Sequence, residues 1–382
     1  MFPKFQELLA SARGALPDHM IEGLINTEAI LGAEGRVPGP ASLDLTFSEE
    51  AYLVPGLRML APGETVREML SSRNATAHDL SQPMWRGASY LVRLNESLKL
   101  PPSVYGFSNP RSKTGRNDIL ARMMADRVES FDSASPRGYA GELWVAVSPN
   151  SFPVIIPVGS SVNQLRFFTR DTRLSRNEIF RVYRTIPLLY SPDGEPIPPE
   201  GLRPGIGEGD SLILTLDLFA KKGGETIAGW ECRGTDHVLD YRRGRGGYTD
   251  RVEDFFSPIR VRAGEFEAKP ESFYILSCQE RVMVPPWLAC EMVEMDPRYG
   301  EFRAHYAGFI DPGWGYGMLG SARGRQLTLE IRTLGRSVTL RHGQPIARIR
   351  FEFMAAIPLV LYDDKPSDFT AQHGPQLSSF FM

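Results

Sequence analysis

An internal repeat constrains the fold of this chain more than any other feature of its sequence. Five pairs of segments or residues match at one constant offset of 184 residues. The pairs are Tyr90–Glu96 with Tyr274–Glu280, Leu143–Val147 with Leu327–Ile331, Val154 with Val338, Gly159 with Gly343, and Phe167 with Phe351. A constant shift across separated segments is hard to obtain by chance, so we predict two copies of one domain in tandem.

The repeated unit has the pattern of a β-domain. Glycine (36 residues) and proline (30 residues) divide the chain into short segments that alternate or are rich in β-branched and aromatic residues. The predicted strands are Ala88–Leu94, Leu143–Val147, Val154–Val158, Leu212–Phe219, Ser272–Cys278, Leu327–Ile331, Ser337–Leu340 and Ile346–Phe353. Short strands separated by turn residues are typical of a sandwich or barrel, so we predict an all-β fold with short helical inserts.

Three segments carry helical signals. Residues 1–12 and Asp118–Arg127 (DILARMMADR) are predicted helices, the latter from its helical spacing. Ser175–Thr185 opens with Ser175 and has Glu178 three residues later, which is the capping-box signature of a helix start. Between the two copies, Tyr190–Asp210 is dense in proline and glycine and has no period. We therefore predict domains at 1–190 and 191–382.

Charge and hydropathy exclude several classes of protein. Lys and Arg (43) nearly balance Asp and Glu (46), so the net charge of −3 provides no positive field for nucleic acid or an anionic membrane. The most apolar stretch, Phe353–Tyr362, has ten residues and contains a proline, whereas a membrane-spanning helix needs about 20. The first residues mix acid and base without the apolar core of a signal peptide. We expect a soluble cytoplasmic protein with no nucleic-acid or membrane partner, in which Arg242–Gly247 is a solvated loop rather than an RNA-binding patch.

Cysteine and histidine give no metal-binding pattern. The cysteines are Cys232, Cys278 and Cys290, an odd number whose spacing supports neither a disulfide framework nor a CxxC zinc site. The histidines are scattered, without an HExxH or HxH pair. We expect no catalytic metal ligated by the protein, and Cys278 and Cys290 to be core residues.

The two copies differ at two places that bear on chemistry. Copy one contains Arg111–Arg116 (RSKTGR), whereas its counterpart Asp296–Glu301 (DPRYGE) lacks the serine and the second cation. Copy two has Glu330 within an apolar strand, where copy one has Ala146. Each copy thus holds half of a candidate site.

Both features also have a purely structural interpretation. Glu330 can be a solvent-facing strand residue on the same face as Thr328 and Arg332, because alternate residues of a strand share a face. Likewise, Arg111–Arg116 can be a solvated turn. The functional interpretation is that arginine, serine and backbone N–H groups in a tight turn bind phosphate oxygens. No GxxxxGK[ST] P-loop is present, so ordinary ATPase chemistry is not supported.

Five segments together resemble the dCTP deaminase and dUTPase superfamily, and among its members the long, two-domain bacterial dCTP deaminases. They are Pro40–Leu45 (an early strand), Arg111–Arg116 (the phosphate-binding motif), Phe309–Trp314 (the nucleoside-pocket motif), Leu327–Glu330 (the strand of the catalytic glutamate) and Phe369–Pro375 followed by Ser378 (the C-terminal lid). The resemblance implies that each copy is a dUTPase-like distorted β-barrel, of the β-clip or jelly-roll type.

Glu330 separates the two activities of that superfamily. The dUTPases have an apolar residue at this position and use the aspartate of the Ile-Asp motif to activate water. The resemblance therefore implies hydrolytic deamination of dCTP to dUTP and ammonia, with Glu330 as general base and then acid. Zinc-dependent deaminases use HxE…PCxxC instead, which this chain lacks. We expect no zinc, and Mg²⁺ only together with the substrate triphosphate.

The resemblance also assigns roles to individual residues. Arg111, Ser112, Lys113 and Arg116 would bind the phosphates or steer Glu330, with Arg116 nearest the carboxylate. Asp311 would contact the deoxyribose, and Trp314 would pack on the sugar or base unless it is a core residue. The lid, with Gln372 and Gly374, would reach the triphosphate. The predicted catalytic residues are Glu330, Arg116 and Ser112.

Two other functions remain open, as does the assembly. Hydrolysis of dUTP through Asp311, alone or after deamination, would give dUMP. A non-catalytic nucleotide-sensing barrel would also fit the loss of half a site in each copy. Family members form trimers with sites at subunit interfaces, so we expect a homo-oligomer, and a homotrimer supplying six barrels is the simplest closure.

Overall fold

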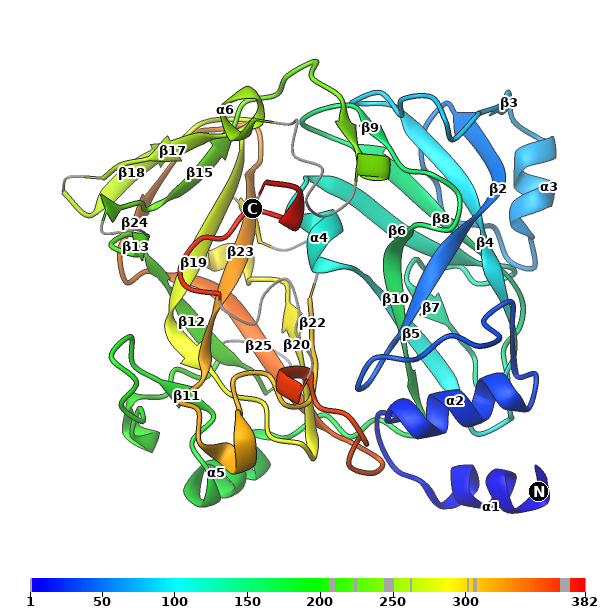
Figure 1. Cartoon of the computed structure of the whole chain (residues 1–382), viewed down its shortest axis with the longest axis horizontal. Coiled ribbons are helices and arrows are strands. Elements are labelled where there is room, and N and C mark those ends of the chain that lie inside the picture. Colours follow the sequence, from blue (N-terminus) through cyan, green and yellow to red (C-terminus); the bar gives the residue numbers. More distant parts are fainter. Residues whose placement is uncertain are drawn as a thin grey trace. The chain divides into compact units, whose positions relative to one another are not determined.

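A computed structural model describes residues 2–205, 210–222, 225–243, 251–261, 263–300, 302–304, 308–364 and 372–381. The chain forms two compact units (Figure 1). Unit 1 comprises Met1–Thr172, Asp236–Tyr248 and Met354–Leu359; unit 2 comprises Arg173–Thr235, Thr249–Phe353 and Val360–Met382. Among the described residues, no helix is both long and apolar enough to cross a membrane.

The junction between the units differs from the predicted boundary at residue 190. It follows Thr172, so that residues 173–190 belong to unit 2. Leu174, Ile179 and Tyr183 of this segment pack into the core of unit 2, and Leu189 pairs with Val282. The proline- and glycine-rich segment that suggested a boundary is therefore a connection inside unit 2.

Unit 1 is built on a sheet in which neighbouring strands are antiparallel. In spatial order the strands are β6 (Ile119–Ala125), β8 (Ala140–Pro149), β4 (Ser89–Lys99), β2 (Leu43–Val54), β10 (Ser161–Phe168), β5 (Tyr105–Pro110) and β7 (Ser133–Ala134). Two short strands extend it: β1 (Ile30–Leu31) pairs with β4, and β3 (Thr76–Ala77) pairs with β2. Apart from this sheet, β9 (Val154–Ile155) forms a two-stranded parallel sheet with β16 (Leu239–Asp240), which comes from the later half of the sequence.

Unit 2 repeats this arrangement. Its corresponding strands, in the same spatial order, are β21 (Phe302–Ala304), β23 (Arg325–Thr333), β19 (Phe273–Val282), β12 (Leu212–Asp217), β25 (Pro345–Phe353), β20 (Leu288–Val293) and β22 (Phe309–Ile310). The other strands are β11 (Leu189–Tyr190), β13 (Lys221–Lys222), β14 (Glu225–Thr226), β15 (Gly229–Cys232), β17 (Ser257–Ile259), β18 (Glu265–Ala268) and β24 (Val338–Arg341).

Strand register confirms the tandem repeat at the level of single residues. Ala146 of β8 lies opposite Leu91 of β4, and Glu330 of β23 lies opposite Ile275 of β19. Each pair is related to the other by the offset of 184 residues found in the sequence. The fold is mostly β, as predicted, and consists of two copies of one domain.

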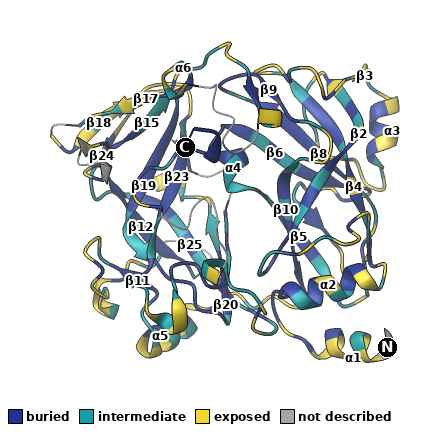
Figure 2. Cartoon of the chain, viewed as in Figure 1, coloured by how far each residue is buried: buried dark blue, intermediate teal, exposed yellow. Residues whose placement is uncertain are grey.

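The helices are short, and α2, α3 and α5 each contribute buried side chains to the packing. They are α1 (Phe2–Ser11), α2 (Asp18–Asn26), α3 (Val66–Ser71), α4 (Ser112–Gly115), α5 (Arg176–Thr185) and α6 (Val252–Phe255). α5 begins after Ser175, whose hydroxyl accepts from the N–H of Glu178 in the predicted capping box. Figure 2 shows the central strands largely buried, whereas α3 and α5 are exposed on one side.

One predicted helix is wrong. Asp118–Arg127 contains strand β6, because Ile119–Ala125 pairs with β8 along its whole length. The burial pattern of β6 alternates over its first four residues, as expected for a strand rather than a helix. The residue before it, Asp118, has a φ of 53° and ends the turn that follows α4.

Candidate active site

Glu330 is buried on the face of β23 that points away from the core of unit 2. Its neighbours Leu329 and Ile331 belong to the hydrophobic core and are fully buried. Since alternate residues of a strand point to opposite faces, Glu330 lies on the other face with Thr328. That face would be open to solvent on an uncovered sheet, yet Glu330 is only 3% exposed. A second layer of chain therefore covers it, and the solvent-facing interpretation of Glu330 is wrong.

The C-terminal segment 372–381 lies on this face of β23. The side-chain amide of Gln372 donates to the backbone carbonyl of Gln326 at 2.8 Å. The N–H of Gly374 donates to the side-chain Oε1 of Gln326 at 3.0 Å. Thr328 Oγ1 donates to the carbonyl of Gly374 at 3.4 Å and accepts from the N–H of Gln376 at 3.4 Å. Gln326, Thr328 and Glu330 alternate along one strand, so the segment lies on the face that carries the glutamate.

The same segment is anchored further along. The indole N–H of Trp230 donates to the carbonyl of Pro375 at 3.0 Å. The ring of Phe381 lies 5.2 Å from that of Phe255 and 5.3 Å from that of Phe256, measured between centroids. The predicted lid residues Gln372 and Gly374 are thus brought to the strand of Glu330, whereas the start of that motif, residues 369–371, lies outside the described residues.

Asp311 and Trp314 follow the short strand β22. Asp311 is half-buried, and its carbonyl accepts from the N–H of Trp314 at 3.2 Å. Trp314 is a core residue that is 6% exposed. The centroid of its indole lies 5.0 Å from that of the Tyr362 ring. The guanidinium of Arg325, at the start of β23, lies 4.9 Å from the indole centroid and pairs with Asp363 at 2.9 Å. Trp314 therefore supports the beginning of the strand that carries Glu330.

In unit 1, the predicted phosphate-binding residues form one compact turn. Arg111 is the N-cap of α4, and Ser112 and Lys113 form its first residues. Arg116 follows as the C-cap and is 4% exposed. The carbonyl of Val162 on β10 accepts from the N–H of Arg111 at 2.8 Å and from the hydroxyl of Thr114 at 2.9 Å. The adjacent strand thereby fixes the backbone of the turn.

Two residues outside the turn contact its side chains. Asp44 on β2 pairs with Arg111 at 3.0 Å. Although the Asp44 side chain keeps 39% of its exposure, desolvation raises its pKa, and Arg111 and Arg36 oppose that rise. The phenol of Tyr241, just after β16, accepts from the amide of Asn117 at 2.8 Å, and the ammonium of Lys113 lies 5.8 Å from its ring centroid.

Sequence reasoning did not identify either contact. Asp44 lies inside the segment Pro40–Leu45 that resembles the family's early strand, but nothing in the sequence links it to Arg111. Tyr241 reaches the turn only because residues 236–248 belong to unit 1. No local sequence pattern predicts that this segment of the later half of the chain packs in unit 1.

The face of unit 1 that corresponds to the Glu330 face is filled by a helix. Glu142, Trp144 and Ala146 stand on β8 where Gln326, Thr328 and Glu330 stand on β23. Trp144 and Ala146 pack with residues of α3 in a separate hydrophobic cluster. That cluster contains Val54, Leu60, Val66, Met69, Leu70, Leu91, Met124, Trp144 and Ala146.

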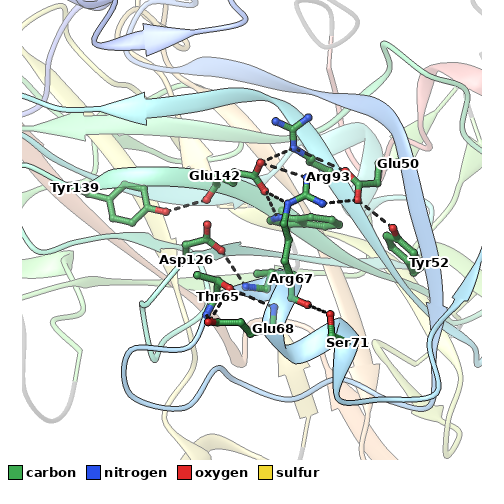
Figure 3. A network of polar contacts seen from close by, with 12 residues as sticks. Glu50, Tyr52, Thr65, Arg67, Glu68, Ser71, Arg93, Asp126, Tyr139 and Glu142 are labelled. Carbon is green, nitrogen blue, oxygen red and sulfur yellow. Dashed lines mark hydrogen bonds and ion pairs between the residues drawn. The ribbon is translucent and has the colours of Figure 1, made fainter.

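A polar network closes the rim of this cluster (Figure 3). Arg67 of α3 binds Glu50 through two nitrogens, each at 2.9 Å, and binds Glu142 at 2.9 Å. Arg93 also pairs with Glu142, at 3.2 Å. The corresponding face of unit 1 is therefore covered by a helix that is held by both apolar packing and ion pairs.

The described residues contain no group of three or more His, Cys, Asp or Glu side chains arranged to hold a metal ion. Cys278 and Cys290 are fully buried core residues, as predicted. Burial raises the pKa of the Cys278 thiol, which leaves it protonated and unreactive.

Comparison with known proteins identifies the family. Residues 12–171 match the 2'-deoxycytidine 5'-triphosphate deaminase N-terminal domain, and residues 199–381 match the C-terminal domain of the same enzyme. The crystal structure of 2'-deoxycytidine 5'-triphosphate deaminase from Agrobacterium tumefaciens aligns with a TM-score of 0.79 and 34% identity, over 91% of this chain and 97% of that chain.

A mutant of Bacillus subtilis oxalate decarboxylase OxdC aligns at a TM-score of 0.12 and 12% identity, over 85% of this chain and 86% of that chain. A search of curated proteins gives no match. The two family domains and the solved structure agree, and the chain belongs to the dCTP deaminase family, in its long two-domain form.

Proposed function

We propose that this chain is a hydrolase that converts dCTP and water to dUTP and ammonia, with Glu330 as general base and then general acid. The observation that carries the proposal is the burial of Glu330, at 3% exposure, on a strand face whose counterpart in unit 1 has Ala146. The domain folds with an alanine at this position in unit 1, so the fold does not require a carboxylate there. A buried carboxylate that the fold does not require is a candidate for proton transfer. Family membership supplies the substrate class.

The chemistry needs one group that can accept and return protons. Glu330 would remove a proton from a water molecule as its oxygen bonds to C4 of cytosine, and would pass that proton to N3. The carboxylate would then take the proton of the new C4 hydroxyl and give it to the exocyclic nitrogen, which leaves as ammonia as the C4 carbonyl forms. In this proposal the carboxylate does the proton transfer without zinc, since the HxE…PCxxC pattern of zinc deaminases is absent from the sequence.

The remaining residues would bind the nucleotide. Arg111, Ser112, Lys113 and Arg116 offer charged and neutral donors to the triphosphate. Mg²⁺ would arrive with the triphosphate and be held mostly by phosphate oxygens and water. Asp311 would bind the deoxyribose.

The C-terminal segment would form the cover of the site. Gln372 and Gly374 already bind β23, so substrate entry requires their hydrogen bonds to open or shift. A homo-oligomer, with a homotrimer as the simplest closed form, would agree with the behaviour of the family.

Incubation with dCTP and Mg²⁺, followed by separation of nucleotides and an ammonia assay, tests the proposal. It predicts equimolar dUTP and ammonia. Formation of dUMP and pyrophosphate in addition would indicate a second activity through Asp311. Stabilisation of the protein by dCTP without ammonia release would instead indicate a nucleotide sensor and contradict the deaminase.

A further inference from the structure

The side chain of Arg111 is held by a residue from a different strand. Its Nη1 lies 3.0 Å from Oδ2 of Asp44, and the two side chains keep 40% and 39% of their exposure. Asp44 on β2 is in register with Gln164 on β10, which is in register with Asn109 on β5. These three residues form a polar row across the sheet, and Arg111 lies two residues beyond Asn109.

The backbone of Arg111 is fixed separately from its side chain. Its N–H donates to the carbonyl of Val162, and its own carbonyl accepts from the N–H groups of Thr114 at 2.8 Å and Gly115 at 3.0 Å. None of these bonds sets the direction of the guanidinium. The ion pair with Asp44 does so, and because a guanidinium has five N–H donors, the others stay available to an anion.

The second copy provides an internal comparison. The row that corresponds to Asp44, Gln164 and Asn109 is Ile213, Arg348 and Val293. Ile213 is buried, at 4% exposure. The corresponding turn has its own pair, in which Arg298 binds Asp296 at 2.6 Å. An acidic residue on the sheet thus occurs in the copy that has the basic turn and is replaced by isoleucine in the copy that lacks it.

We propose that Asp44 is a positioning residue, which holds the Arg111 guanidinium in the direction that binds the triphosphate of the substrate. This inference rests on the proposed function for the identity of the anion. It makes an unusual prediction, because removal of a negative charge beside an anion site should tighten binding by Coulomb attraction alone. If Asp44 acts by orienting Arg111, the same removal weakens binding.

Binding measurements separate these effects without any turnover. In the Glu330→Gln background, isothermal titration with dCTP and with inorganic tripolyphosphate gives dissociation constants for both anions. We expect Asp44→Asn to raise both constants about tenfold, a change of about 1.4 kcal/mol. The matched control is Asp296→Asn, which removes the carboxylate of the pair on the corresponding turn of unit 2. It should leave both constants within about twofold.

A double-mutant cycle distinguishes positioning from a general structural role. In an Arg111→Ala background, Asp44→Asn should have no further effect on tripolyphosphate binding, because the group that it positions is gone. An equal further loss in that background would overturn the inference. So would unchanged or tighter binding by Asp44→Asn, or no tripolyphosphate binding by the Glu330→Gln chain.

The two proposals fail in different ways. A chain that binds dCTP and tripolyphosphate through Asp44 and Arg111 but releases no ammonia contradicts the deaminase while supporting this inference. A chain that releases ammonia and in which Asp44→Asn leaves binding unchanged contradicts only the inference.

Discussion

The guanidinium of Arg67 lies over the indole of Trp144, with its central carbon 5.4 Å from the ring centroid. Trp144 is fully buried, and with Ala146 it occupies the strand face that carries Thr328 and Glu330 in the other unit. The corresponding cover in unit 2 is a terminal segment held to the strand by hydrogen bonds, whereas α3 is packed into a hydrophobic cluster. One face can therefore open more readily than the other.

This difference predicts one nucleotide site per chain. Titration of the Glu330→Gln protein with dCTP should give a stoichiometry of about one per chain, because α3 and Trp144 occupy the second face. The Arg67→Ala variant should keep that value, since the apolar packing of α3 remains. A stoichiometry near two in either protein would show that the face in unit 1 binds nucleotide.

The two kinds of contact in this cover should contribute unequally to stability. Trp144→Ala removes a large, fully buried side chain and should destabilise unit 1 by about 3–5 kcal/mol. Arg67 is half exposed, so solvent screens its ion pairs, and Arg67→Ala should cost about 1 kcal/mol or less. Urea unfolding of both full-length variants measures the comparison. Equal losses of unfolding free energy in the two variants would contradict the conclusion that apolar packing contributes most of the stability of this cover.

A carboxylate that occurs in both units, buried at Glu96 and half-buried at Glu280, predicts a pH dependence of stability. Glu96 accepts from the N–H and hydroxyl of Thr46 at 2.9 and 2.8 Å, and Glu280 binds Thr215 in the same way at 2.8 and 2.7 Å. Burial raises the pKa of both glutamates above the usual 4.5, against the opposite effect of these hydrogen bonds. A raised folded-state pKa means that the folded protein binds the proton more tightly than the unfolded chain.

The stability that each bound proton adds to the folded protein is therefore fully present below pH 4.5, and it is lost as the pH rises through the raised pKa. The free energy of unfolding of the wild type, minus that of Glu96→Gln, should fall as the pH increases from 4 to 7. Urea unfolding at several pH values measures this difference. A difference that grows with pH would contradict the raised pKa.

Tyr241 should support the basic turn through its ring and its hydroxyl separately. Tyr241→Phe keeps the ring beneath Lys113 and removes the oxygen that accepts from Asn117, so we expect dCTP binding to weaken about twofold to fivefold, in line with one hydrogen bond. Tyr241→Ala removes both contacts and should weaken binding further. The control is Tyr299→Phe, on the corresponding turn of unit 2. Binding of wild-type strength in both Tyr241 variants would exclude this role.

Much of the fold could be predicted because the repeat fixes which segments correspond. The offset that matched Ala146 with Glu330 in the sequence is the offset between their positions in the sheets. The prediction of a helix at Asp118–Arg127 was wrong because its apolar residues fit both a helical and a strand period. Pairing with β8 makes this segment a strand.

The candidate site was predictable only where its residues are neighbours in sequence. Arg111–Arg116 and Glu330 stand in local motifs, so their residue types indicate their chemistry. The contact of Asp44 with Arg111 depends on strand order, and that of Tyr241 with Asn117 on a segment crossing between units. Neither long-range contact leaves a local pattern.

The steady-state rate of ammonia release from dCTP by Glu330→Gln tests the central claim most directly, beside Glu267→Gln as a matched change at an exposed strand residue. We predict that Glu330→Gln lowers kcat by about 10² to 10⁴-fold, the usual contribution of general acid–base catalysis, while dCTP still binds and Glu267→Gln keeps the wild-type rate. Retention of the wild-type kcat by Glu330→Gln would contradict the account.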